Sequence, residues 1–261
     1  MLLAIDVGNT NTVFALFEGE LQVGLWRAET DGQRTADEYA VFLKMLMADA
    51  GLDCGTISAA IIGSVVPNVN YNLIRLCRYH FLCEPYLVGT NEVETGMKIA
   101  IDRPEELGAD RLINAVAGYA LYKGALLIID FGTATTFDVI DQAGTYRGGA
   151  IAPGINLSLQ ALHMAAAKLP SVAVAKPSSV IATGTVTAIQ SGIFFGYVGL
   201  IEGMVARIKQ EFGAPMRVVA TGGLAKLFVD SIASIDEVNM DLTLRGLAMI
   251  YEKNKKRKAA A

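Results

Sequence analysis

The sequence predicts an α/β protein made of two duplicated domains, and two observations support this prediction. Residues 5–16 and residues 129–140 repeat one pattern, in which an apolar strand is followed by Asp-x-Gly, then small hydroxyl or amide residues, then a second apolar strand. Elsewhere, apolar runs of strand length alternate with segments of helical periodicity, which is typical of an α/β layer. At 261 residues the chain is long enough for two modest domains.

The first half is predicted to begin with a hairpin and to continue as alternating strands and helices. Its strands are expected at Leu2–Ile5, Val13–Phe17, Gln22–Ala28 and Ala59–Val66. Thr35 and Glu38 have the spacing of a capping box at the start of a helix, and Gly51 is placed to end that helix. Pro67 stops the fourth strand, and a second helix is expected over Asn70–Phe81.

The second half repeats this order after a polar segment at residues 84–107. Its strands are expected at Leu126–Ile129, Thr136–Ile140 and Arg217–Gly223, and its helices at Ala109–Tyr122, Asn156–Ala166, Thr185–Phe212 and from Leu224. Apolar residues in 185–212 cover more than one helix face, which fits a helix buried against its own sheet and against another subunit. We place an N-terminal domain at residues 1–115, a C-terminal domain at 116–255 and a disordered basic tail at 256–261.

Composition narrows the class of protein. Apolar residues make up 52% of the chain and charged residues 18%, which favours a large core with a buried subunit interface, so we expect an oligomer and specifically a homodimer. The net charge of −4 argues against a nucleic-acid partner, and the basic C-terminus is interpreted as a solvated tail rather than a nucleic-acid or membrane patch. With no visible signal peptide, no membrane-spanning apolar run and three cysteines without C-x-x-C spacing, we expect a cytoplasmic protein that contacts no membrane.

Each repeated turn carries a carboxylate, exposed backbone N–H groups and hydroxyls. Such a turn suits phosphate and its metal ion, because glycine lets the backbone approach the anion while Asp holds the cation. Asp6 and Asp130, brought together across a cleft between the domains, would organise cations beside a triphosphate. One copy alone is a weak signal, because Asp and Gly are common in ordinary turns. Two copies between apolar strands indicate duplicated domains that face one nucleotide.

Three segments resemble the two phosphate motifs and the adenosine motif of the acetate kinase, sugar kinase, Hsp70 and actin superfamily: Asp6–Thr10, Asp130–Thr133 and Ala220–Gly223. Within that superfamily the chain resembles the type III pantothenate kinases, from Leu2 to about Tyr251. The further markers, in the family's order, are Ser64–Pro67, Gly108–Arg111, Gly148–Gly154, Thr185 and Ala188–Gly192. The resemblance implies an α/β fold with two duplicated ribonuclease H-like (actin-like ATPase) domains, whose mixed sheets are flanked by helices.

The same resemblance implies ATP-dependent phosphorylation of pantothenate to 4′-phosphopantothenate, the first step of coenzyme A biosynthesis. ATP, with Mg²⁺ or another divalent cation, would be bound by Asp6, Val7, Gly8, Asn9, Thr10, Asn11, Thr12, Val13 and Thr133. Asp130 would bind a monovalent cation, K⁺ or NH₄⁺. Phosphoryl transfer depends on charge neutralisation and in-line positioning more than on covalent chemistry, and turn residues of these types can supply both.

Asp110 is the predicted general base, because a carboxylate beside the substrate hydroxyl can accept its proton as the phosphoryl group moves. Arg111 follows about 100° around the helix, where its guanidinium can grip the substrate's carboxylate or amide oxygens. On the residues alone, the two would be an ordinary pair at a helix start, and the family's motif reverses that interpretation. The resemblance adds Gly108, Ala109 and Thr185 as substrate contacts.

One position departs from the family's pattern. Family members place a substrate-contacting tyrosine seven positions before Gly108, and this chain has Ile101 there. The change leaves open a kinase of the same fold that acts on another small hydroxy acid. A second alternative is a non-catalytic accessory transcription regulator of the same family. The retained Asp110, the two phosphate turns and the acidic net charge argue against a purely regulatory role.

Overall fold

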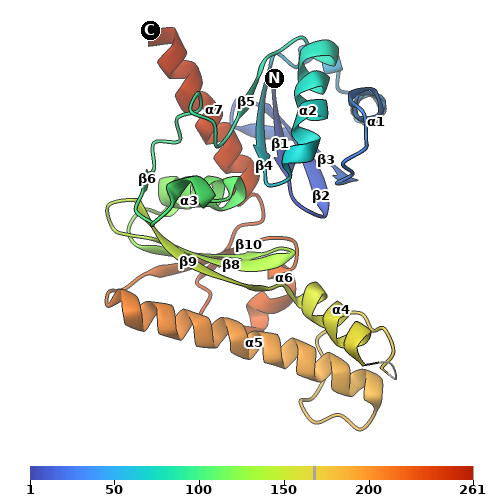
Figure 1. Cartoon of the computed structure of the whole chain (residues 1–261), viewed down its shortest axis with the longest axis vertical. Coiled ribbons are helices and arrows are strands. Elements are labelled where there is room, and N and C mark those ends of the chain that lie inside the picture. The colour runs from blue at the N-terminus through green and yellow to red at the C-terminus, as the bar shows by residue number, and fades with distance from the viewer. Residues whose placement is uncertain (167–168, 261) are drawn as a thin grey trace. The chain divides into compact units, whose positions relative to one another are not determined.

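The computed structural model describes residues 1–166 and 169–260, which form two compact units. Unit 1 combines Met1–Met97, Asp102–Ala117 and the residues from Asp241 onward. Unit 2 combines Lys98–Ile101 with Gly118–Met240. Each unit contains one mixed sheet with helices packed on it (Figure 1).

The strands of unit 1 are β1 Leu2–Val7, β2 Asn11–Glu18, β3 Leu21–Glu29, β4 Ala59–Ser64 and β5 Pro85–Leu87. Their order in the sheet is β3-β2-β1-β4-β5. The first three pair antiparallel in chain order, and β4 and β5 add in parallel on the other side of β1. The four strands predicted in this half are therefore confirmed, and β5 is a short addition within the polar segment.

The helices of unit 1 are α1 Ala36–Asp49, α2 Pro67–Arg75, α7 Leu242–Ala260 and the first part of α3 Ala109–Tyr122. A π-helical turn, Leu76–His80, extends α2. The predicted capping box is present at α1: Glu38 N–H donates to Thr35 Oγ1 at 3.3 Å, and Thr35 N–H donates to the Glu38 carboxylate at 2.7 Å. The capping box satisfies two backbone donors that would otherwise be unpaired at the helix start.

Helices cover both faces of the unit 1 sheet. Leu3 and Ile5 of β1 belong to a buried cluster with residues of α1 and α2. Leu2 and Ala4 belong to a second cluster with residues of α3 and α7. Successive side chains of a strand point to opposite faces, so burial on both sides explains why β1 is an unbroken apolar run up to Asp6.

The strands of unit 2 are β6 Lys98–Ile99, β7 Leu126–Phe131, β8 Ala134–Ile140, β9 Thr145–Pro153, β10 Arg217–Thr221 and β11 Glu237–Val238. Their order is β11-β10-β7-β8-β9-β6. Here β7, β8 and β9 pair antiparallel in chain order, while β10 adds in parallel to β7 and β11 to β10. The topology of unit 1 is thus repeated, which confirms the predicted duplication.

The helices of unit 2 are α4 Ile155–Ala165, α5 Thr185–Phe212, α6 Ala225–Phe228 and the end of α3. Figure 1 shows α5 running along the sheet, and its Phe194, Tyr197 and Ile201 are buried in one cluster with Ile129 and Phe131. Among the described residues α5 alone is long and apolar enough to cross a membrane, with a mean hydropathy of 1.4. Its buried side chains belong to the core of unit 2, and a core helix has this composition too.

The two units differ from the predicted domain boundaries at the C-terminus and in the crossing segment. From Asp241 onward the chain belongs to unit 1, because Leu244, Leu247 and Ile250 are buried in its core. Residues 98–101 belong to unit 2, because β6 pairs with β9. The segment predicted as a disordered tail, 256–261, continues α7 through Ala260, and its last residue lies outside the described chain.

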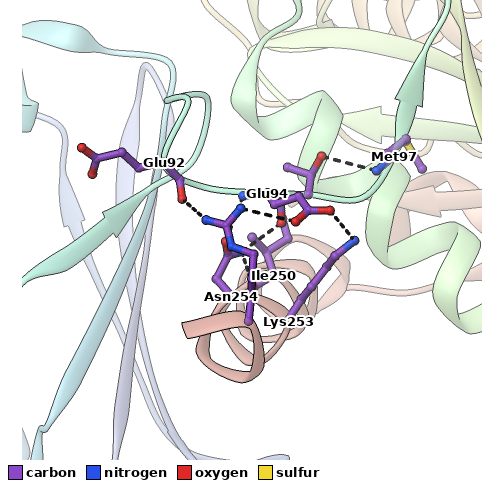
Figure 2. Close-up of polar contacts among 8 residues, drawn as sticks. Glu92, Glu94, Met97, Ile250, Lys253 and Asn254 are labelled. Carbon is purple, nitrogen blue, oxygen red and sulfur yellow. Dashed lines mark hydrogen bonds and ion pairs between the residues drawn. The ribbon is translucent and has the colours of Figure 1, made fainter. Parts of the chain in front are cut away.

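Polar contacts attach α7 to Glu92 and Glu94 of the polar segment (Figure 2). Asn254 is buried, accepts a hydrogen bond from Glu94 N–H at 2.9 Å and donates to Glu94 O at 2.9 Å. Arg257 and Lys253 form ion pairs with the Glu94 carboxylate at 3.4 and 3.5 Å. Arg257 also donates to Glu92 O at 2.9 Å. Two of the basic residues near the C-terminus, Lys253 and Arg257, therefore form contacts within unit 1.

Candidate active site

The first repeated turn joins β1 to β2 and presents an open, amide-rich backbone. Gly8 N–H donates to Asn11 O at 3.0 Å, and the strands resume pairing at Val7 and Thr12. Asn9, Thr10 and Asn11 are exposed, whereas Asp6 at the end of β1 is half-buried. Such a turn presents main-chain and side-chain donors to an anion, and the Asp6 carboxylate lies at the end of the strand that leads into it.

Thr30, directly after β3, contacts this turn through its backbone and its side chain. Its N–H donates to Thr10 O at 3.0 Å, and its hydroxyl donates to Gly8 O at 2.8 Å. The same hydroxyl lies 2.9 Å from the Thr12 hydroxyl, which is fully buried. Sequence reasoning did not include Thr30, because no motif marks it. Only the pairing of β2 with β3 could have placed it beside the turn.

Val65 connects the first turn to the predicted catalytic residues. It follows β4, and its N–H donates to Val7 O at 3.1 Å. Its Cγ1 lies 3.8 Å from the position that a Cβ on Gly108 would occupy. Gly108 is followed by α3, whose Ala109 and Ile113 are buried in the same unit. The structure thus brings the predicted phosphate residues and the predicted substrate segment 108–111 together in unit 1.

Asp110 is half-buried at the first turn of α3. Burial raises the pKa of its carboxyl, and the adjacent Arg111, through its backbone N–H and its charge, partly opposes this rise. Arg111 N–H donates to Asp110 Oδ1 at 2.7 Å, which holds the carboxylate in place. A Cβ on Gly108 would lie 2.6 Å from the same oxygen, so glycine leaves room for it. A fixed carboxylate with a raised pKa suits a proton acceptor.

The second repeated turn is one residue shorter than the first. Gly132 N–H donates to Ala134 O at 3.2 Å, and pairing resumes at Phe131 and Thr135. Aligning residues 5–16 with 129–140 without a gap matches Thr12 with Thr136. This match is wrong as a structural equivalence, because Thr12 pairs with Val7 whereas Thr136 pairs with Asp130. Thr135 occupies the position of Thr12, and its buried hydroxyl contacts the Tyr197 hydroxyl of α5 as that of Thr12 contacts Thr30.

Two glycines pack against the second turn. Gly154 N–H donates to Thr133 O at 3.1 Å, and a Cβ on Gly154 would overlap that oxygen. Gly222 follows β10 with φ +91°, and a Cβ there would overlap Asp130 Oδ1 and the backbone at Phe131. The half-buried Asp130 carboxylate therefore lies in a space that any larger residue at 222 would fill.

The resemblance to the family implies that Asp130 binds a monovalent cation, and its carboxylate is a hard oxygen donor of the kind that such an ion prefers. Gly222 is the residue type that can pack this closely on the carboxylate without overlapping it. No cluster of three or more His, Cys, Asp or Glu side chains that would hold a metal by itself occurs in the described chain.

Thr185 and Ile101 lie apart from the second turn. Thr185 is exposed at the N-terminus of α5, about 18 Å along the helix axis from Tyr197, which contacts the turn. Ile101 follows β6, and its Cγ2 lies 3.6 Å from the position of a Cβ on Gly148. Within unit 2, the structure therefore does not gather the predicted substrate contact Thr185 with Asp130 and Thr133.

A sequence profile described as type III pantothenate kinase matches residues 2–207 of the chain. The chain belongs to the type III pantothenate kinase family. A protein of Paramagnetospirillum magneticum named type III pantothenate kinase is 61% identical over an alignment that covers 97% of this chain and 98% of that protein. The family predicted from the sequence is thereby confirmed.

Solved structures share the fold at much lower identity. A Campylobacter jejuni protein, titled as a conserved, proposed Baf family transcriptional activator, has a TM-score of 0.62 and 19% identity, covering 97% of this chain and 99% of that one. The ROK hexokinase of Thermus thermophilus has a TM-score of 0.51 and 13% identity, and the match covers 97% of this chain and 99% of that one. At these identities the likenesses show the fold alone, and they agree with two ribonuclease H-like, actin-like ATPase domains.

Proposed function

We propose that this chain transfers a phosphoryl group from ATP to pantothenate, giving 4′-phosphopantothenate in coenzyme A biosynthesis. The observation that carries the proposal is the position of Asp110 in a member of this family. Its carboxyl has a raised pKa and lies in the same unit as the phosphate-type turn, with Val65 joining the two segments. A proton acceptor next to a phosphate-binding turn is what transfer to a hydroxyl requires.

In this proposal the first turn binds ATP. Amide and hydroxyl groups of the segment Asp6–Val13, with Thr133 from the second turn, hold the phosphate oxygens. A divalent cation such as Mg²⁺ accompanies the phosphates, and Asp130 holds K⁺ or NH₄⁺. When bound, these cations neutralise negative charge that develops on the transferred group.

The substrate is bound around Gly108, Ala109 and Arg111. The Arg111 guanidinium binds the carboxylate or amide oxygens of pantothenate, and Thr185 adds a hydroxyl contact. The Asp110 carboxylate accepts the proton of the hydroxyl that attacks the γ-phosphorus. Because the carboxylate is held by Arg111 N–H at 2.7 Å, it needs little reorientation before the proton moves.

A coupled assay of ADP release tests this function. We expect release that depends on pantothenate and increases with K⁺ over a Na⁺ control at the same ionic strength. Product should be identified by mass as phosphopantothenate. No pantothenate-dependent ADP above background would contradict the proposal.

Ile101 favours one alternative, a kinase that acts on another small hydroxy acid. Where the family has an aromatic hydroxyl, this chain has an aliphatic side chain beside Gly148. The same assay with a panel of hydroxy acids distinguishes the two substrates by their kcat/KM values. An acid that exceeds pantothenate by tenfold or more, on the order of 1.4 kcal/mol, would favour the alternative.

We also propose a cytoplasmic homodimer that associates through α5. Gly192, Gly196 and Gly199 lie on one exposed side of this helix, and a Cβ on any of them would meet nothing within 4 Å. Glycine inside a helix costs about 1 kcal/mol relative to alanine, and such positions let a second helix approach closely. The three cysteines are free thiols, which suits a reducing compartment. Sedimentation should give a dimer for the native chain and a monomer for Gly196→Arg.

A further inference from the structure

We infer that Thr30 is a positioning residue for the phosphate turn, the segment Gly8–Asn11 between β1 and β2. The inference rests on the proposed function, because it takes this turn to bind the phosphates of ATP. Thr30 lies outside the sequence motifs described above. It is half-buried directly after β3, where the end of that strand passes the turn.

The contacts of Thr30 have a defined direction. A hydroxyl has one proton to donate, and that of Thr30 is given to Gly8 O at 2.8 Å. In the 2.9 Å contact between the two hydroxyls, Thr12 must then be the donor and Thr30 the acceptor. Donation by Thr12 polarises the Thr30 hydroxyl and strengthens its bond to the turn. The buried Thr12 thus fixes Thr30, which in turn fixes Gly8.

This bonding orients the amide groups of the turn. In a planar trans peptide the C=O and N–H bonds point in opposite directions, and cis peptides are absent from the described chain. Because Gly8 O points to the Thr30 hydroxyl, the N–H of Asn9 points away from Thr30. Thr10 O accepts from Thr30 N–H at 3.0 Å, so the N–H of Asn11 points away as well. The Asn11 N–H lies on the same side of β2 as Asn11 O, which accepts from Gly8 N–H at 3.0 Å, so it faces the inside of the turn. Asn9 is exposed, so its N–H is the amide that this bonding turns toward a bound anion.

The hydroxyl of Thr30 is separable from the structural role of its backbone. The β2–β3 ladder begins at Asn11 and Glu29, and the bond from Thr30 N–H to Thr10 O needs only a residue with a backbone N–H. The side chain adds the contacts to Gly8 and Thr12. Valine at this position keeps the shape and the backbone bond and removes those two contacts alone.

The test compares Thr30→Val with Thr30→Ser and with a matched control, Thr56→Val. Thr56 also donates its hydroxyl to a backbone oxygen, Asp53 O at 2.6 Å. It precedes β4, however, and so lies at the opposite end of the strands from the turn. We expect Thr30→Val to raise the KM for ATP roughly fivefold, as for the loss of one hydrogen bond, with the KM for pantothenate within about twofold of native. Thr30→Ser and Thr56→Val should keep native values of both.

Binding of ATP with Mg²⁺ should be measured in parallel by calorimetry, because it needs no acceptor substrate. A native chain that binds ATP but phosphorylates no pantothenate would contradict the proposed function and still allow Thr30 to be tested by the same fivefold loss of affinity. Unchanged ATP affinity in a folded Thr30→Val would overturn the inference. The inference would also be overturned if Thr30→Val had a lower melting temperature and equal changes in the KM values for ATP and pantothenate. The same holds if Thr30→Ser did not keep the native affinity for ATP.

Discussion

The two repeated hairpins have the same framework and different turns. Strands β1 and β7 have one burial pattern, with four buried residues, a half-buried Asp and a buried residue at the end. The first turn then spans four residues between the paired positions Val7 and Thr12, whereas the second spans three between Phe131 and Thr135. Packing on both faces of a sheet fixes the strands, and the turns are left free to differ in length and chemistry.

The difference in length changes what each turn offers a ligand. The longer turn is held by the hydroxyl and N–H of Thr30, and the bond to Gly8 O turns the N–H of the exposed Asn9 away from Thr30. The shorter turn is enclosed by Gly154 and Gly222, which crowd its carbonyls and the Asp130 carboxylate. An open array of N–H groups suits phosphate, and an enclosed oxygen-rich site suits a cation. In the proposed function, the first turn therefore binds most of the phosphate oxygens, and the Asp130 carboxylate of the second turn binds the monovalent cation beside Thr133.

The largest expected effect lies outside both turns. If the turns only bind ligands, the proton acceptor has to be elsewhere, and Asp110→Asn should lower turnover by about a thousandfold or more while the melting temperature stays close to native. Asp102→Asn, an exposed aspartate of the same unit, should behave as native. Turnover of Asp110→Asn within tenfold of native would exclude Asp110 as the proton acceptor.

Gly222→Ala should damage the second turn alone. The new Cβ would be strained at φ +91° and would displace the Asp130 carboxylate. We expect at least a tenfold rise in the K⁺ concentration needed for half-maximal activity, with a smaller change in the KM for ATP. Gly213 of the same unit is the matched control, because it also has a positive φ, +73°, but a Cβ there meets nothing within 4 Å. An equal response of Gly222→Ala and Gly213→Ala would contradict the proposed role of Gly222.

Asn254→Ala should lower the stability of the protein and leave the binding of ATP and of the cation unchanged. The variant leaves Glu94 N–H and O without their partner, and we expect a loss of about 1–3 kcal/mol in the free energy of unfolding by urea. Lys256→Ala, at an exposed position of the same helix, should lose less than about 0.5 kcal/mol. A large change in the KM for ATP in Asn254→Ala would mean that α7 also positions the first turn.

The smallest expected effect is a shift in the pH dependence of kcat/KM. The proton acceptor works as the carboxylate, so kcat/KM should fall as pH drops through the Asp110 pKa, which burial places above the usual aspartate range. Arg111→Gln removes a charge that lowers this pKa, so the acid limb should move to higher pH. Folding stabilises the neutral form here, and that contribution to stability is lost as pH rises through the folded-state pKa. If the acid limb does not move in Arg111→Gln, it reports the titration of a group other than Asp110.

The fold was largely predictable because its strands and helices carry strong local signals. The capping box at Thr35 and the apolar periodicity of 185–212 gave α1 and α5 with little or no error. A helix was expected from Leu224, but α6 ends at Phe228. The long helix α7 was not predicted, because its C-terminal half is basic and polar and it is held by contacts with Glu92 and Glu94, far away in the sequence.

The candidate site was predictable where a motif marks it and not where pairing creates it. The family's motifs gave Asp110 and the first turn, and the structure places them in one unit. Thr30 lies beside Gly8 only because β3 pairs with β2, and the sequence shows no sign of that contact. The gapless comparison of the two turns could not show that one is shorter, because register is fixed by strand pairing.

A K⁺ titration of phosphoryl transfer in Asp6→Asn and Asp130→Asn tests the division of roles most directly. If the first turn serves the phosphates and the second the cation, Asp130→Asn should lose activation by K⁺. Asp6→Asn should keep the native K⁺ midpoint and show a raised KM for ATP with Mg²⁺. Equal loss of the K⁺ response in both variants, or a native K⁺ response in Asp130→Asn, would contradict the account.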